Sequence, residues 1–390
     1  MRRWTGALLA AGVLAATDVA ADPTGSASAA ADDFDDLDDE PELDDPLSWQ
    51  IGTMLVLRPV ALIQAQAAPY VGDDALVVTG DAADSEGFRL RRARLGFSGV
   101  AAAIVPFQVS GELAGDTARL VDAWVGVVPK PFVGLYAGAR KVPFSRSAIM
   151  GADRTALIER PFAVRAMAPF RQVGMSLEGD ILGPMLHYSV GLFNGFQRSD
   201  LFGEGYTENA AAFGNRFDEL AVAGRLSTAP LGELGESMAD LDHSSFRFGV
   251  GCSAFYSDGG TRDIIGVEGD FLIHSHGFHF LGEFLWDTAE PESKPTQGST
   301  QLAKVERMSA VGELGYVVLP RMLSLSARVE WMDPNTGIDD NGDQVAISAG
   351  FAFHVWEDYA KVQAEFVHRE ELNGPSLDND AMVIQVQLGL

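Results

Sequence analysis

Apolar and polar residues alternate with a period of two along most of the chain that follows an N-terminal segment. In the last part of the sequence, Met382, Ile384 and Val386 share one face of the chain. Gln385 and Gln387 lie between them, on the opposite face. Strict alternation over about 8–11 residues is typical of a β-strand with one apolar face. The pattern therefore predicts an all-β chain.

The alternation recurs in sixteen segments, and their connectors differ in length. The predicted strands cover 49–67, 88–99, 106–114, 119–128, 132–141, 171–181, 186–193, 219–228, 246–257, 263–273, 277–287, 308–318, 323–332, 344–355, 359–368 and 381–390. Short connectors, such as 129–131 and 183–185, alternate with long polar ones, of which 142–170 is the longest. Two connectors break this rule, because 229–245 is long and 258–262 is short for its place.

An even number of such strands predicts a transmembrane antiparallel β-barrel over residues 48–390. Strands of about ten residues match a tilted crossing of the hydrocarbon layer. A barrel of this size encloses an aqueous lumen, so its apolar face must look outward into lipid. Short turns at one end and long loops at the other are typical of outer-membrane barrels, with the turns periplasmic and the loops extracellular.

The N-terminal segment is expected to be a targeting signal rather than part of the fold. Arg2 and Arg3 precede a short apolar stretch, and small residues follow at 19–21, which predicts a signal peptide over 1–21. Residues 22–47 carry ten acidic residues within fourteen positions. Because such a density of like charge opposes folding, we expect an acidic, disordered periplasmic tail. A segment that traps cations or enters a basic pore is the alternative.

Composition excludes several classes of protein. The net charge of -27 argues against nucleic-acid binding, and one cysteine excludes a disulfide scaffold. His274, His276 and His279 form a histidine string, and 333–343 is an acidic loop, but neither has the ligand spacing of a known metal site. No histidine pairs by spacing with a nucleophile. We therefore predict no enzyme activity, no metal site and no cofactor; loose binding of a divalent cation to the acidic loop stays an alternative.

Basic residues are concentrated in one part of the predicted barrel. Residues 89–171 contain thirteen Lys or Arg and five Asp or Glu, whereas 172–390 contain twelve and thirty-three. Arg92 and Arg94 should face the lumen, because Ala93 and Leu95 must face lipid, where a charge near the midplane costs roughly 2–4 kcal/mol. The later strands put many carboxylates on the same face, so the lumen either holds ion pairs across the pore or is only weakly selective.

Several segments resemble the phosphate-selective porin O and P family of Gram-negative outer membranes. The resemblance is carried by five stretches: the arginine-rich strand 88–99, Val121–Val125, Ala137–Phe144, Ile158–Arg160 together with Phe170–Gly174, and Tyr188–Gly195. It implies a homotrimeric sixteen-stranded channel in the outer membrane, among lipid and lipopolysaccharide, that passes small anions and above all phosphate.

Residues and resemblance together predict an anion-binding, pore-lining set. Its members are Arg92, Arg94, Arg140, Lys141, Arg160, Arg165 and Arg171. Arginine forks bind phosphate through two parallel hydrogen bonds, and rings of Arg or Lys make anion-selective constrictions. Loop 142–170, the longest, could fold into the lumen and narrow it, and the sequence leaves this open. The alternatives are a general or weakly cation-preferring diffusion porin and a non-conducting structural barrel.

Overall fold

The computed structural model describes residues 47–72, 86–115, 117–198, 205–206, 219–260, 262–291 and 304–390. The signal peptide expected over 1–21 lies outside these ranges. So does the acidic segment expected over 22–47, apart from its last residue. Both therefore stay predictions.

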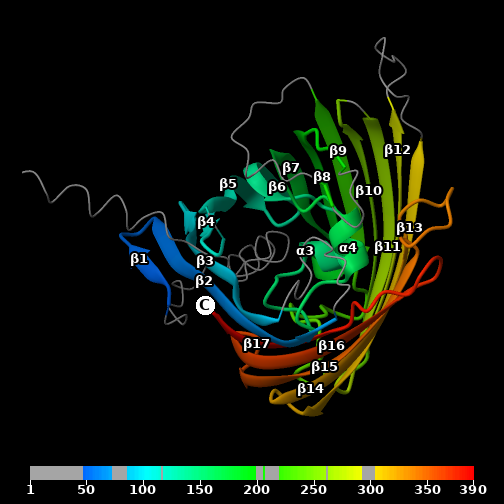
Figure 1. The fold of residues 1–390 in the computed structure, drawn as a ribbon. Helices are drawn as coiled ribbons and strands as arrows, with labels where there is room; N and C mark the ends of the chain where they lie inside the picture. The colour runs from blue at the N-terminus through cyan, green and yellow to red at the C-terminus, as the bar shows by residue number, and fades with distance from the viewer. Residues whose placement is uncertain are drawn as a thin grey trace, which may run out of the picture.

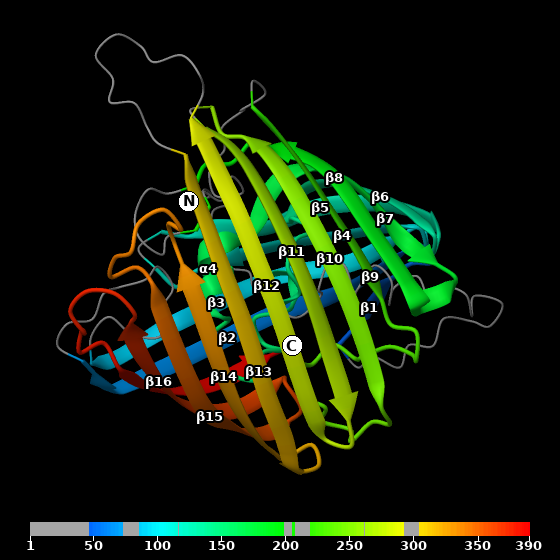
Figure 2. The ribbon, with the colours of Figure 1, turned by 90° about the vertical axis from the view of Figure 1, so that its right-hand side faces the viewer.

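Sixteen strands, β2 to β17, form one closed antiparallel sheet, which confirms the predicted barrel (Figures 1 and 2). Each strand pairs with the next along the chain, and β17 pairs with β2 to close the cylinder. The strands are β2 (Leu55–Val71), β3 (Gly87–Ala101), β4 (Val105–Glu112), β5 (Arg119–Lys130), β6 (Val133–Lys141), β7 (Arg171–Ile181), β8 (Leu186–Asn194), β9 (Leu220–Thr228), β10 (Arg247–Asp258), β11 (Arg262–Ser275), β12 (Phe278–Pro291), β13 (Val305–Leu319), β14 (Leu323–Asp333), β15 (Gln344–Trp356), β16 (Ala360–Glu371) and β17 (Ala381–Gly389).

The first predicted strand, 49–67, is wrong as a single element. It is divided into a short β1 (Trp49–Ile51) and the barrel strand β2, and β1 folds back to pair with the start of β2. Gly52 lies between them with a φ of 65°. Because a residue without a Cβ adopts this left-handed conformation at little cost, the chain reverses there.

The alternating apolar and polar residues of the sequence lie on the two opposite faces of the barrel wall. In β17, Ile384, Val386 and Leu388 are exposed, whereas Gln385 and Gln387 between them are buried. Large exposed apolar side chains recur in this way around the barrel. Since water would penalise such a surface, it is suited to contact with lipid, and the polar residues line the interior. Cys252 of β10 belongs to the exposed face.

The long connection 142–170 between β6 and β7 lies inside the barrel and carries two short helices. These are α3 (Arg146–Ile149) and α4 (Phe162–Met167), both visible in the interior in Figure 1. Helix α4 packs against the inner side of β12, β13 and β14. Phe144, Phe162 and Met167 belong to a buried apolar cluster that also includes Phe255 of β10. The loop therefore packs on one wall of the lumen.

The connection 229–246 between β9 and β10 enters the lumen from the opposite end, where the short turns lie. Its backbone N–H of Met238 donates to the carbonyl of Arg154 in the 142–170 loop, at 3.0 Å. Met238 also shares an apolar cluster with Met150 and Ala156 of that loop. This explains why a connection at the turn end is so long. A short 3-10 helix, η1 (Gly183–Met185), forms the neighbouring turn.

None of the described helices is both long and apolar enough to cross a membrane.

Candidate functional site

The arginine-rich strand β3 does not follow simple alternation. In its pairing with β2, Arg92 lies opposite Gln64 and Leu90 lies opposite Ala65, so Arg91 has no partner and forms a β-bulge. A bulge inserts one residue and changes the face on which the following side chains lie. Arg91 and Arg92 can therefore both point into the lumen although they are consecutive.

Glu159 of the 142–170 loop lies between these two arginines. Its Oε1 accepts from Arg91 Nε at 2.5 Å, and its Oε2 accepts from Arg91 Nη2 at 3.1 Å. Arg92 Nη2 adds a third contact to Oε2, at 3.3 Å. Two parallel N–H···O bonds from one guanidinium are the strong geometry for a carboxylate.

More positive charge surrounds this ion pair. Arg94, two residues along β3, bonds Glu112 Oε2 at 2.6 Å. Arg160 and Arg165 of the loop lie close enough for their charges to act on Arg92 and Glu159, respectively. We call these side chains the arginine cluster: Arg91, Arg92, Arg94, Arg160 and Arg165. The cluster therefore brings five guanidinium groups together around Glu159 and Glu112.

The charge state of Glu159 follows from these neighbours. Burial alone would raise its pKa, but the charges of Arg91 and Arg92 and the hydrogen bond from Arg91 outweigh burial and lower the pKa well below its usual range. The carboxylate is therefore ionised at neutral pH.

The backbone around Glu159 is held by β14 and β16, which lie a few strands from β3 around the barrel. The N–H of Ile158 donates to Glu365 of β16 at 2.7 Å, and the carbonyl of Glu159 accepts from Arg328 of β14 at 2.9 Å. Because main chain and side chain have partners on different strands, this part of the loop links β3 to β14 and β16.

Six inward carboxylates of the later strands form what we call the carboxylate wall: Glu268, Asp270, Glu283, Glu313, Glu330 and Glu365. All are buried. Arg225 pairs with Glu268 and Asp270, and Arg328 pairs with Glu313, Glu330 and Glu365. The loop also bonds to this wall: Arg146 bonds Asp270 at 2.6 Å, and the hydroxyls of Ser145 and Ser147 donate to Glu283. These ion pairs join strands of the same wall, and the contacts from the loop anchor the loop to that wall.

The seven predicted residues all lie on the lumen side or in the loop, but in different surroundings. Arg92, Arg94 and Arg165 belong to the arginine cluster around Glu159 and Glu112. Arg160 also belongs to it, yet its guanidinium turns back to donate to the carbonyls of Ser147 and Met150.

The remaining three predicted residues bond to a nearby strand of the barrel or to the 142–170 loop. Arg140 pairs with Glu178 at 2.8 Å and stacks on the ring of Tyr136. Lys141 donates to the carbonyls of Ile149 and Met150. Arg171 forms a two-bond pair with Asp122, at 2.9 and 3.1 Å.

Arg91 is not among the lumen residues predicted from the sequence, although the sequence indicates that it faces the lumen. Arg89 and Arg91 share one phase of alternation, and Arg92 and Arg94 share the other. If the strand were regular, one of these pairs would face lipid, which is costly. Four arginines in both phases therefore require a bulge, and Arg91 is where it lies.

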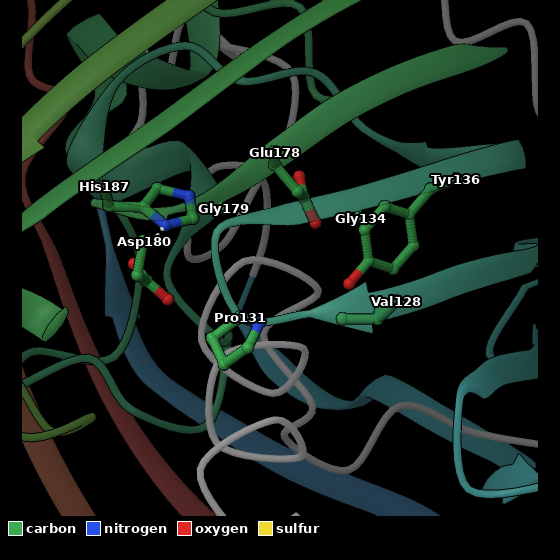
Figure 3. A pocket seen from close by; sticks show the side chains of 8 residues that line it. All are labelled: Val128, Pro131, Gly134, Tyr136, Glu178, Gly179, Asp180 and His187. Carbon is green, nitrogen blue, oxygen red and sulfur yellow. Dashed lines mark hydrogen bonds and ion pairs between the residues drawn. The ribbon is translucent and has the colours of Figure 1, made fainter. Parts of the chain in front are cut away.

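Near the turn end, residues of β5 to β8 line a small recess (Figure 3). His187 and Asp180 point toward each other there, with Nδ1 and Oδ1 2.8 Å apart, while Glu178 and Tyr136 lie on its other side. Within the described ranges, no three His, Cys, Asp or Glu side chains come together in a way that would hold a metal ion.

Comparison with known proteins matches these features to a family. The family model for phosphate-selective porin O and P matches residues 71–245. None of the curated protein sequences that were compared matches the chain.

Solved structures with the same fold are outer-membrane channels. An anion-selective porin from Comamonas acidovorans aligns with a TM-score of 0.57 and 12% identity, over 86% of this chain and 100% of its own. The channel DcaP of Acinetobacter baumannii aligns with a TM-score of 0.57 and 12% identity, over 88% and 99%. The trimer form of OmpT from Vibrio cholerae aligns with a TM-score of 0.56 and 11% identity, over 86% and 100%. At such identities the similarity shows the fold alone.

The matched range contains the arginine-rich strand β3 and the whole of the inward loop. The resemblance drawn from the sequence motifs is therefore confirmed over residues 71–245, where the phosphate-selective porin O and P model matches, and the sixteen-stranded barrel has the fold of outer-membrane porins.

Proposed function

We propose that this protein is a porin through which small anions diffuse passively across an outer membrane, with phosphate as the leading candidate. The observation that carries the proposal is the arginine cluster, which gathers five guanidinium groups on one side of a lumen narrowed by the 142–170 loop. The family match supports the same function.

In this proposal the cluster replaces part of the water around an entering anion. Guanidinium groups donate charge-assisted hydrogen bonds to oxyanions, and their positive field excludes cations. Arg91 is the most accessible of the paired arginines of β3, with 20% of its side chain exposed. Arg140, Lys141 and Arg171 hold wall and loop in position and contribute charge. Binding must stay weak enough for release, so several such contacts act in series.

The surroundings proposed for the protein follow from its surface and its relatives. The exposed apolar band suits outer-membrane lipid, with lipopolysaccharide around the loop end. One structural neighbour is described as a trimer and another as anion-selective, which supports a homotrimer and an anion preference here. Transport of this kind needs no cofactor and no catalytic residue.

A cation-preferring diffusion porin is the second candidate, and the carboxylate wall favours it. Its acidic side chains cover the inner face of β11 to β16. These groups already hold arginines, serine hydroxyls or backbone N–H groups of the loop. Since their charge is largely compensated, we rank this candidate below the anion channel.

The deciding measurement is the single-channel reversal potential in a planar bilayer across a KCl gradient, with and without phosphate. We expect a potential that reports chloride preference, and a current that phosphate reduces. A potential of the opposite sign would favour the cation-preferring porin, and no conductance at all would favour a structural barrel.

Replacing Arg92→Ala together with Arg94→Ala tests the residues. We expect the chloride preference to fall, because two of the five guanidinium groups of the arginine cluster are removed. Arg321→Ala is the control, since this arginine is exposed at a turn and pairs with Asp242. An unchanged selectivity in the double variant would contradict the proposed role of the cluster.

A further inference from the structure

Glu159 occupies the position that an anion would take in the arginine cluster. Its two oxygens meet the Nε and Nη2 of Arg91, and one of them also meets Arg92. This is how a guanidinium fork binds any ligand with two acceptor oxygens side by side, such as a carboxylate or a phosphate. The loop thus brings its own carboxylate to the site.

Contacts with strands of the barrel hold the loop in place at Glu159. The loop 142–170 contains only two acidic residues, Asp153 and Glu159. The carbonyl of Glu159 accepts from Arg328 of β14, and the N–H of the preceding residue, Ile158, donates to Glu365 of β16. Gln66 of β2 lies beside the carboxylate as a further, long contact of 3.5 Å. The backbone is therefore held, while the side chain keeps its own rotatable bonds.

We propose that Glu159 is a resident surrogate anion that sets the affinity and the specificity of the pore. An oxyanion entering the arginine cluster exchanges with the Glu159 carboxylate at Arg91 and Arg92, and Glu159 returns when the oxyanion leaves. The inference rests on the proposed anion function and names the substrate class, oxyanions with two adjacent acceptor oxygens.

Two consequences follow from this exchange. The internal carboxylate prevents the arginine cluster from holding an oxyanion too tightly, which a pore needs for release. It also favours oxyanions over chloride, because a single spherical ion cannot satisfy the two-bond geometry that Glu159 satisfies at Arg91.

The test is the substitution Glu159→Gln, which keeps the size and one acceptor oxygen but removes the charge. Single channels are recorded in KCl with increasing inorganic phosphate. We expect the phosphate concentration for half-block to fall roughly three- to tenfold, the effect of removing one nearby charge in a partly screened site. Chloride preference without phosphate should also rise.

The matched control is Asp153→Asn, which removes the same charge from the same loop. Asp153 is equally buried, but it pairs with Arg154, away from the arginine cluster. We expect little change in half-block. An equal gain in both variants would overturn the inference, because it would mean that any lost loop charge strengthens block. Heat-modifiable migration in gels shows whether each variant has a folded barrel.

The Arg92→Ala, Arg94→Ala variant separates the two proposals. If it loses selectivity while Glu159→Gln behaves as the wild type, the surrogate role of Glu159 is wrong and the anion channel stands. If neither variant changes selectivity or block, the arginine cluster is not the anion site and the surrogate role of Glu159 is wrong with it; the anion channel itself is wrong if the wild type shows cation preference.

Discussion

Glu159 owes its charge to two arginines that a regular strand would place on opposite faces. The lowered pKa means that its ion pair contributes full stabilisation above the ordinary carboxyl range, near ~4.3, and loses it only as the pH falls through the lowered value. We therefore expect wild type and Glu159→Gln still to differ in phosphate block at pH 5. Bilayer recordings at both values test this; a difference that vanishes by pH 5 would count against the ion pair.

Asp153 provides the contrast at the same scale. Burial is the main cause of its raised pKa, the charge of Asp358 adds to it, and Arg154 opposes it. On acidification Asp153 therefore loses its charge before Glu159 does. A change in conductance at mildly acidic pH that comes from protonation of Asp153 should be absent from Asp153→Asn, which has no carboxyl group there, and present in Glu159→Gln.

At the scale of single elements, strand β6 depends on one glycine. Gly138 has a φ of 131°, and a Cβ there would lie 2.1 Å from the carbonyl oxygen of Ala123 on β5. We expect Gly138→Ala to destabilise the barrel by more than ~1–2 kcal/mol, since strain and a backbone clash combine. Urea unfolding in lipid vesicles measures this. Gly312→Ala on β13, where the space is open, should be close to neutral.

At the scale of the whole molecule, the lumen is filled from both ends. Loop 142–170 meets the connection 229–246 where Arg154 bonds Glu236 at 2.7 Å. Replacing 145–167 by a short Gly-Ser linker should raise single-channel conductance several-fold and weaken ion selectivity, because the narrowing is lost together with Arg160 and Arg165 of the arginine cluster. Shortening 334–343 at the barrel rim is the control. Unchanged conductance after the first replacement would show that the loop does not limit flow.

The strands could be predicted from sequence because alternation is a local property. It arises because one face of each strand contacts lipid and the other faces the aqueous lumen. Even the inward position of Arg92 and Arg94 follows from it, through the apolar residues Ala93 and Leu95. In each case the reasoning needed only neighbouring residues and the cost of charge in lipid. The inward path of loop 142–170 was left open by the sequence.

The partners of the lumen residues could not be predicted in the same way. Glu159 meets Arg91, and Ile158 meets Glu365, across distances of the chain that only the closed barrel brings together. Their pairing depends on strand register, on the bulge at Arg91 and on the path of the loop. The turn after Gly52 was missed because the alternation continues through it in phase.

The junction between β2 and β17 joins the barrel strands that are farthest apart in the sequence. An exported chain that lacks β17 has hairpins but also two open edges, each with a row of unpaired backbone groups. Lipid penalises those groups heavily, and in water they invite pairing with other chains. Insertion must therefore await the last strand. Until then the nascent protein needs a chaperone or an assembly machine that shields both edges, and truncation before β17 should produce aggregates instead of a narrower barrel.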